Sequence, residues 1–134
     1  MKHIDEALVA LLSAAPEVAL LVSHRIYAAQ SPQGGTLPAV VYSRDGNNRV
    51  GFVSLDNTAP YARATYTLSA MAETFQESRN LARAIRRAIE YKQTADVRLV
   101  RVTEESDLIE QPVSGEQMPV YRTDLTVEIT HVEP

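Results

Sequence analysis

The sequence predicts an α+β fold, in which two main helices pack on one face of a mainly antiparallel sheet of about four to five strands. Residues 62–70 alternate strictly between apolar and polar side chains, which is the period of a half-buried strand. Residues 4–15 and 74–91 instead carry apolar side chains at helical spacing. Together with the remaining strand-like segments, they give the order α-β-β-β-α-β-β, which is typical of an antiparallel sheet with helices on one side.

The first helix is predicted from an apolar stripe at three- and four-residue spacing, formed by Ile4, Leu8, Leu11, Leu12 and Ala15. Asp5 and Glu6 lie in its first turn, where the helix dipole favours carboxylates. Pro16 ends this helix, because proline pushes the preceding residue out of the helical region. Residues 17–22 are expected to form one further short turn, with Pro16 at its first position.

Two strands are predicted before the alternating segment. Residues 25–28 form a short strand, and residues 38–44 form a second one that opens with proline and is rich in β-branched and aromatic side chains. Residues 31–35 between them form a loop, because they are turn residues. Residues 45–61 contain two Gly, three Asn and one Pro, and are therefore predicted as a long loop or ragged hairpin. Its only strand-like piece is 49–55.

The second main helix begins after Thr74 and reaches about Tyr91. Thr74 and Glu77 form a capping-box pattern, in which each side chain satisfies an exposed backbone N–H of the other. The buried stripe of this helix is expected to be Leu81, Ala82, Ile85, Ala88 and Ile89. Its other faces carry a basic patch of Arg79, Arg83, Arg86 and Arg87.

Two further strands are predicted after this helix. Residues 97–103 form the first, and the alternation slips between Leu99 and Val100, which suggests a β-bulge. Residues 104–119 are predicted as a second long loop. Residues 121–131 form the last strand, which alternates cleanly, so that the sheet has one apolar face and one polar face that is wet or covered by a neighbouring subunit.

Length and composition bound the class of protein. The 134 residues argue for one domain over residues 1–134. The absence of Cys excludes a disulfide, a thiolate metal site and a thiol nucleophile, and a net charge of -4 argues against a general nucleic-acid binder. Of the 13 basic residues, only Lys2 and Lys92 are lysines. This arginine enrichment favours protein contacts, and GC-rich codon use explains it equally well.

The apolar run over residues 7–22 does not predict a signal peptide or a membrane span. Asp5 and Glu6 place negative charge where a signal peptide carries basic residues, and Pro16 and Glu17 interrupt the run. A membrane span needs about 20 apolar residues. We therefore expect a soluble intracellular product.

No catalytic, cofactor-binding or metal-binding residues are predicted. His3, His24 and His131 are too scattered for a local metal motif and are expected to be solvated or capping residues. The serines lack a Gly-x-Ser-x-Gly elbow, and Gln33-Gly34-Gly35 lacks the lysine and the spacing of a phosphate-binding loop.

A second charged segment is acidic. Glu104, Glu105, Asp107 and Glu110 lack the alternating oxygen ligands and the glycine of a calcium loop. We interpret them as a solvated acidic loop, as a contact for an arginine-rich partner, or as a surface that repels passing DNA. The basic patch lacks the interleaved aromatic residues that stack nucleic-acid bases, so it is either a solvated helix face or a subunit contact.

Several segments in their order resemble a known family. They are Arg-Ile-Tyr at 25–27, Leu-Pro-Ala-Val-Val-Tyr at 37–42, the strand 62–70 running into the helix at 74–85, Glu-Ser-Asp-Leu at 105–108, and Tyr-Arg-Thr-Asp-Leu-Thr-Val at 121–127. Together they resemble the tail-completion family (tail-terminator, head–tail joining) of long-tailed bacteriophages and gene-transfer particles. The resemblance covers residues 4–131. Residues 45–59 are longer and richer in Gly and Asn than in that family, and residues 111–119 lack its shorter turn.

The resemblance implies a small structural protomer that is not an enzyme and carries no cofactor. It implies a ring, commonly of six copies, that caps the finished tail tube, stops its polymerisation and joins the tail to the head. The implied partners are other copies of the chain, the tail-tube protein and the head connector or head-completion protein. DNA passes through such a ring without specific binding, and no membrane is involved. The implied locations are the bacterial host cytoplasm during assembly and the virion tail or neck.

Two hypotheses follow for the interface. In the first, the acidic segment of one subunit faces arginines of a neighbour or of the connector, since a ring needs two different complementary surfaces. In the second, residues 45–59, with Arg49 and Phe52, reach a partner and become ordered only in the assembled tail. The alternative functions are another head–tail neck component, a tail-tube subunit, a generic α+β protein-binding module, and an enzyme whose site is assembled from distant residues.

Overall fold

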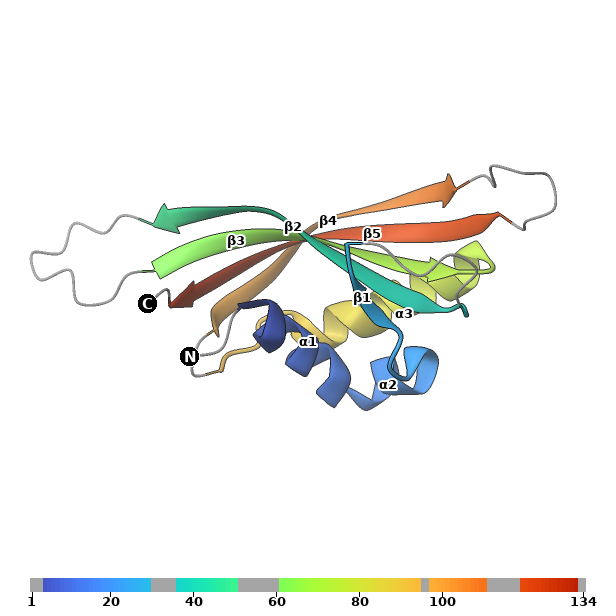
Figure 1. Cartoon of the computed structure of the whole chain (residues 1–134), viewed down its shortest axis with the longest axis horizontal. Coiled ribbons are helices and arrows are strands. Elements are labelled where there is room, and N and C mark those ends of the chain that lie inside the picture. Colours follow the sequence, from blue (N-terminus) through green and yellow to red (C-terminus); the bar gives the residue numbers. More distant parts are fainter. Residues whose placement is uncertain (1–3, 30–35, 51–60, 95–96, 111–118, 133–134) are drawn as a thin grey trace, which may run out of the picture.

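The computed structural model describes residues 4–29, 36–50, 61–94, 97–110 and 119–132, which form an open sheet covered on one face by helices (Figure 1). The helices are α1 (Ile4–Ala14), α2 (Pro16–Val22) and α3 (Phe75–Ile89). The strands are β1 (Ile26–Ala28), β2 (Ala39–Val50), β3 (Tyr61–Ala72), β4 (Val97–Glu110) and β5 (Val120–Val132). The predicted α+β class and the predicted order of elements are confirmed.

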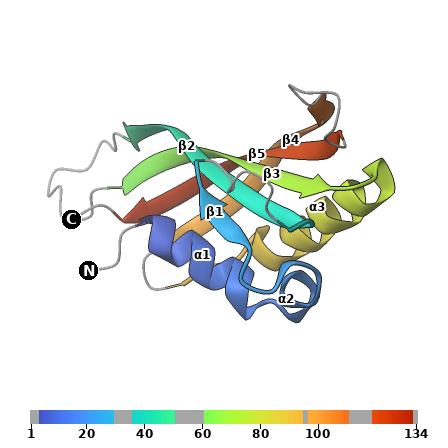
Figure 2. The same cartoon turned by 45° about the vertical axis from the view of Figure 1, so that its right-hand side comes forward.

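The sheet has the strand order β1-β2-β3-β5-β4. β1 runs parallel to β2, and every other neighbouring pair is antiparallel. All three helices lie under the same face, as both views of the molecule show (Figures 1 and 2). The opposite face of the sheet carries the polar side chains of the alternating strands.

The core lies between this sheet and the helices. On β3, the even-numbered residues from Ala62 to Ala70 are all fully buried, as the alternation predicts. They meet the apolar stripe of α3, with Leu81, Ile85 and Ile89 at 0% exposure. The hydrophobic cluster also contains Leu8, Leu12, Val18, Val22, Leu125, Val127 and Ile129. Pro16 occupies the first turn of α2, which confirms the predicted break between the two N-terminal helices.

β2 is longer than predicted. Residues 45–50 continue the strand instead of beginning a loop, and they pair with β3 as far as Val50 opposite Tyr61. The register shifts once, between Arg44 and Gly46. The turn-forming residues there are held by the hydrogen-bond ladder to β3, which outweighs their weak strand propensity. The predicted long loop is therefore wrong for residues 45–50, and residues 51–60 lie outside the described residues. The hypothesis that residues 45–59 become ordered only in the assembled tail stays a prediction.

β4 is also longer than predicted. The segment 104–110 is a strand and not a loop, since it pairs continuously with β5 from Glu104 opposite Thr126 to Glu110 opposite Val120. Its residues are all exposed, so no alternation of polarity marks it in the sequence. The predicted bulge lies one residue earlier, between Val97 and Leu99, and a second one lies between Val102 and Glu104.

The histidines differ from the prediction at one position. His131 is buried, at 7% exposure, and its Nε2–H donates to Asn47 Oδ1 at 3.1 Å. His24 is exposed, as expected, and His3 lies outside the described residues. Among the helices that the structure describes, none is long and apolar enough to cross a membrane.

Candidate subunit interface

The start of α3 positions the main polar cluster of the molecule. Thr74 is the N-cap, and its Oγ1 accepts a hydrogen bond from the backbone N–H of Glu77 at 3.2 Å. This contact is the threonine half of the predicted capping box. Thr74 thereby fixes the first turn of α3. This turn directs Ser78 towards the sheet, where it is fully buried, and places Arg79 on the side of the helix that faces β4.

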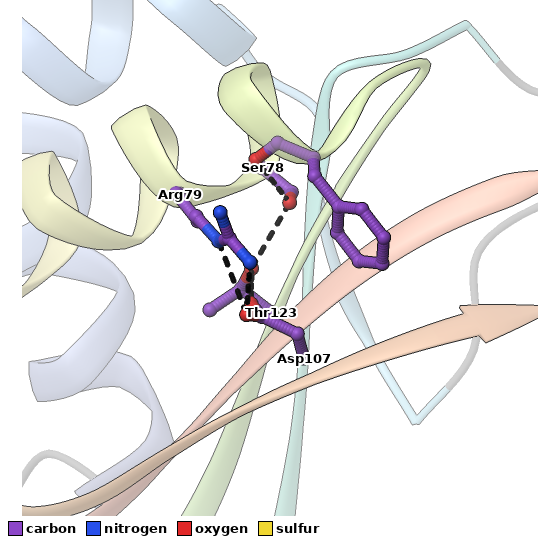
Figure 3. Close-up of polar contacts among 5 residues, drawn as sticks. Ser78, Arg79, Asp107 and Thr123 are labelled. Carbon is purple, nitrogen blue, oxygen red and sulfur yellow. Dashed lines mark hydrogen bonds and ion pairs between the residues drawn. The ribbon is translucent and has the colours of Figure 1, made fainter.

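Four side chains from α3, β4 and β5 form one hydrogen-bonded network (Figure 3). Arg79 donates from Nε and Nη2 to Asp107 Oδ2, at 3.1 and 2.7 Å. Thr123 Oγ1 donates to the other oxygen of the same carboxylate at 2.8 Å, and Ser78 Oγ lies 2.9 Å from Thr123 Oγ1. Because Thr123 gives its single proton to Asp107, Ser78 shares its own proton between Thr123 and the carbonyl of Phe75, which is also 2.9 Å away.

The network fixes the ionised form of Asp107. The hydrogen bonds from Arg79, and then that from Thr123, hold the pKa of the Asp107 carboxyl below its usual range. The carboxylate consequently stays charged at neutral and mildly acidic pH, and the pairing is lost only as the pH falls below the ordinary range of an aspartate. The Asp107 side chain is 32% exposed, so solvent screens the pair.

Aromatic contacts hold the same arginine from the other side. Phe75 and Tyr121 meet edge to face, with ring centroids 4.6 Å apart and an interplanar angle of 68°. The guanidinium carbon of Arg79 lies 5.3 Å from the centre of the Phe75 ring, which is a cation–π distance. Arg79 is thus fixed by a carboxylate and a ring, although its side chain is 58% exposed.

A groove of about 380 Å³ lies between α3 and β4 and brings the basic and acidic segments together. The predicted interface residues that line it are Arg79, Arg83, Arg86, Glu104 and Glu105. The expectation of separate basic and acidic surfaces is therefore wrong, because residues 28 apart in sequence pair within one protomer. We call this surface the α3–β4 groove.

Glu110 lies on the opposite face of the sheet. Its carboxylate pairs with Arg122 Nη1, and Arg122 Nε lies 3.0 Å from Asp124 Oδ1 in a contact that is ionic without the alignment of a hydrogen bond. On the same face, Thr67 Oγ1 donates to Asp45 Oδ2 at 2.6 Å. Alternation along β4 thus directs Glu110 and Asp107 to different faces.

The remaining predicted interface residues are dispersed. Arg87 lines a different groove, of about 630 Å³, between α3 and the α1–α2 pair, whose lining includes Leu11, Pro16 and Ala88. Arg49 lies on β2 opposite Ala62. Phe52 lies outside the described residues. Among the residues that the structure describes, no group of three or more His, Asp or Glu side chains is arranged to hold a metal ion.

The comparison with protein families identifies the family of this chain. The family model described as Tail completion protein gp17 matches residues 6–129. The chain belongs to the tail completion protein gp17 family. It is accordingly a structural, non-enzymatic protein of the virion tail, and the resemblance inferred from the sequence is confirmed.

Solved structures show the same fold. Nineteen chains match significantly, and one of them comes from the structure described as "Virion of native gene transfer agent (GTA) particle". It aligns with a TM-score of 0.62 at 17% identity, over 94% of this tail completion protein and 92% of that chain. No curated protein matches the sequence significantly.

The sequence prediction missed the residues that organise the cluster in this tail completion protein. Ser78 and Thr123 are both fully buried. Each stands at a core position of an otherwise apolar stripe or alternating strand, and this signal is visible in the sequence. Polar side chains at core positions are expected to find partners, so the two could have been predicted to bond to something buried.

Proposed function

We propose that this protein assembles into a ring, commonly of six copies, that caps the tail tube, ends its polymerisation and joins the tail to the head connector. The observation that carries this proposal is the tail-completion family match over residues 6–129, which spans nearly all of the described sheet and helices. The proposed partners are further copies of the chain, the tail-tube protein and the head connector or head-completion protein. DNA passes through the ring without specific binding.

The α3–β4 groove supports a contact with a neighbouring subunit or the connector. Arg79 and Asp107 satisfy each other within the protomer, and Glu110 pairs with Arg122. The groove also presents Arg83 and Arg86 on its basic side and Glu105 on its acidic side, while Glu104 lines its rim and alternates with Glu105 towards the opposite face of the sheet. We therefore assign the intermolecular contact at this groove to Arg83, Arg86 and Glu105 first.

Deletion of the gene in the particle that encodes it tests the function. We expect tails of uncontrolled length that are not attached to filled heads, measured by electron microscopy of negatively stained lysates. Supply of the wild-type chain in trans restores joined particles of normal tail length. Deletion mutants with normal tails on filled heads would overturn the proposal.

Charge reversal tests the assigned contact. Arg83→Glu/Arg86→Glu should reduce the number of joined particles, because like charges across an interface cost several kcal/mol. Arg87→Glu is the matched control for each of the two single variants, Arg83→Glu and Arg86→Glu, since it makes the same single change on the same helix but lines the other groove. Asp107→Lys would be ambiguous, because it also breaks the pairing with Arg79. Equal particle yields from the double variant and the wild type would remove these residues from the interface.

A further inference from the structure

A pocket of about 430 Å³ lies on the face of the sheet that the three helices leave uncovered (Figures 1 and 2). Its lining comes from β2, β3, β4 and β5, together with Ala29, which follows β1. The strand registers place these side chains on one face, since Val41 pairs with Ser69 and Ser69 pairs with Asp124. We call this site the outer-face pocket.

The outer-face pocket combines an apolar floor with hydroxyl groups. Val41 and Met71 form the floor, and each is 8% exposed. Two serines and Thr67 also line the pocket. Thr67 donates its proton to Asp45, so the lone pairs of its oxygen are free to accept hydrogen bonds. A ligand that matches this lining has an apolar stem and hydrogen-bond donors at its end.

The charged groups of the outer-face pocket leave an excess of negative charge. Arg122 forms ion pairs with the carboxylates of both Glu110 and Asp124. A third carboxylate, that of Asp45, is bonded to Thr67 in the lining. Three carboxylates thus stand against one guanidinium, and the local field favours a further cation.

Asp124 is the carboxylate with an unmet capacity for hydrogen bonds. Its Oδ1 is buried, and its contact with Arg122 Nε at 3.0 Å lacks the alignment of a hydrogen bond. The Asp124 side chain is 16% exposed, so the carboxylate can be reached from the pocket. A largely buried carboxylate that is only partly satisfied favours an additional donor, and a cationic donor most strongly.

An arginine side chain has the chemistry that this pocket requires. Its aliphatic stem packs on apolar surface while its charged head stays among polar groups. Its guanidinium presents a fork of N–H donors to carboxylate and hydroxyl oxygens, and it is weakly hydrated. A lysine ammonium is more strongly hydrated and therefore suits a half-buried site less well. A bare metal ion would leave the apolar floor uncovered.

The chain exposes arginines on its other side. α3 carries four arginines and one acidic residue over Phe75–Ile89, and Arg83 and Arg86 among them are exposed. α3 lies under one face of the sheet and the pocket opens on the other (Figures 1 and 2). A contact between the helix side of one copy and the outer face of the next joins two different surfaces, which is the arrangement that a ring requires.

We propose that Arg83 and Arg86 of one copy bind at the outer-face pocket of the next copy, where a guanidinium pairs with the carboxylate of Asp124. This inference rests on the proposed ring, and it names the surface of the neighbouring subunit that receives the arginines of the α3–β4 groove.

Removal of the Asp124 charge without a change of shape tests the pocket. Asp124→Asn should lower the fraction of tails that carry a ring by about tenfold or more, because the entering guanidinium then lacks its carboxylate. Asp124→Glu keeps the charge and should retain most of the rings. Glu128→Gln is the matched control and should behave as wild type, since it neutralises an acid on the same strand and face outside the pocket. Thermal melting of the isolated variants shows whether each one folds as stably as wild type.

Cross-linking provides a second measurement that leaves every charged residue in place. The chain has no cysteine, so Ser69→Cys/Asn80→Cys and Ser43→Cys/Asn80→Cys each carry one thiol in the pocket and one on α3. Asn80 is exposed and lies one turn before Arg83 on the helix surface. A short bismaleimide added to purified tails should give a ladder of covalent oligomers on a denaturing gel, and Ser69→Cys alone should give none.

The outcomes separate the contact from the function. Rings that form normally with Asp124→Asn and yield no cross-link from either cysteine pair would overturn the pocket contact and leave the ring intact. Cross-links that stop at dimers, or that join the pocket cysteine to a different protein of the particle, would overturn a second copy as the occupant. Wild-type tails of normal length that carry no ring would overturn the proposed function itself.

Discussion

Ser78 and Thr123 place two hydroxyl groups where the surrounding helix and strand bury apolar side chains. Both are fully buried, and they link the Phe75 carbonyl of α3 through Ser78 and Thr123 to the carboxylate of Asp107 on β4. Such a pair favours this position of α3 on the sheet, because a displaced helix would break the buried polar contact between Ser78 and Thr123. The exposed arginine and carboxylate above them are positioned by this buried pair.

Removal of the Thr123 hydroxyl should therefore be costly. Thr123→Val is expected to lower the free energy of unfolding by about 1–3 kcal/mol, because Asp107 loses a donor and the buried Ser78 hydroxyl loses one of its two partners. Urea denaturation followed by circular dichroism measures the change. Thr123→Ser keeps the hydroxyl and should retain most of the stability, and a Val variant as stable as wild type would contradict the prediction.

Tyr66 gives the protein a sensitivity to alkali. It is fully buried under α1, and its hydroxyl donates to Asp5 Oδ1. Burial, followed by the hydrogen bond to Asp5, raises the pKa of Tyr66 far above its usual value. The stability that this provides is complete below the pKa of an unfolded tyrosine, about 10, and is lost as the pH rises above it.

Thermal melting between neutral pH and pH 11 tests this sensitivity. Wild-type protein should lose stability above about pH 10, and Tyr66→Phe should show a shallower loss because one buried ionisable group is gone. At neutral pH the same variant should be less stable by about 1–2 kcal/mol, since Asp5 loses a donor. Tyr91→Phe, at an exposed position, is the control and should leave both quantities unchanged.

At the scale of elements, the N-cap of α3 positions the residues of the candidate interface, because Ser78 and Arg79 lie in the first turns that Thr74 fixes. Thr74→Ala should lower the free energy of unfolding by about 1 kcal/mol, while Thr74→Ser should be nearly neutral. Chemical denaturation of the three proteins measures this difference. Equal stability of the Ala variant and wild type would show that α3 is held by packing alone.

The elements that the sequence predicts well are those with one buried face. β3 and β5 alternate strictly, and α1 and α3 have regular stripes, so their positions follow from periodicity. The outer halves of β2 and β4 were predicted as loops for two different reasons. Residues 45–50 include Gly46 and two asparagines, which favour turns locally, and residues 104–110 are exposed on both faces. Only pairing with distant strands makes these segments extended.

The charged residues of the candidate interface were predicted from sequence, but their partners were not. Arg79 and Asp107 were predicted to lie on separate surfaces. The topology of the sheet instead brings Arg79 Nη2 within 2.7 Å of Asp107 Oδ2. Arg79 and Asp107 are 28 positions apart and meet because β4 pairs with β5 beside the start of α3. Local sequence patterns do not encode that pairing. The same topology separates Glu110 from Asp107, although only three positions divide them in the chain.

At the scale of the whole molecule, the proposed ring should respond to salt, because acidic and arginine side chains are proposed to hold part of its contacts. Raising the ionic strength from about 0.1 M to about 1 M shortens the screening length from about 10 Å to about 3 Å and weakens exposed charge pairs. We expect purified tails to lose this protein progressively over that range, measured by sedimentation and immunoblotting of the tail fraction. Retention that is independent of salt would assign the contact to apolar and backbone groups.

The position of β5 has a consequence for synthesis of the chain. β5 follows every other described element in sequence, yet it lies between β3 and β4 in the sheet. While the ribosome has not yet released this segment, β3 lacks one neighbour and β4 lacks the one strand neighbour that it has among the described residues, so the nascent polypeptide cannot complete its core. Prematurely terminated products would then expose unpaired strand edges, which makes them substrates for quality-control proteases. Their degradation would keep incomplete copies from being incorporated into particles.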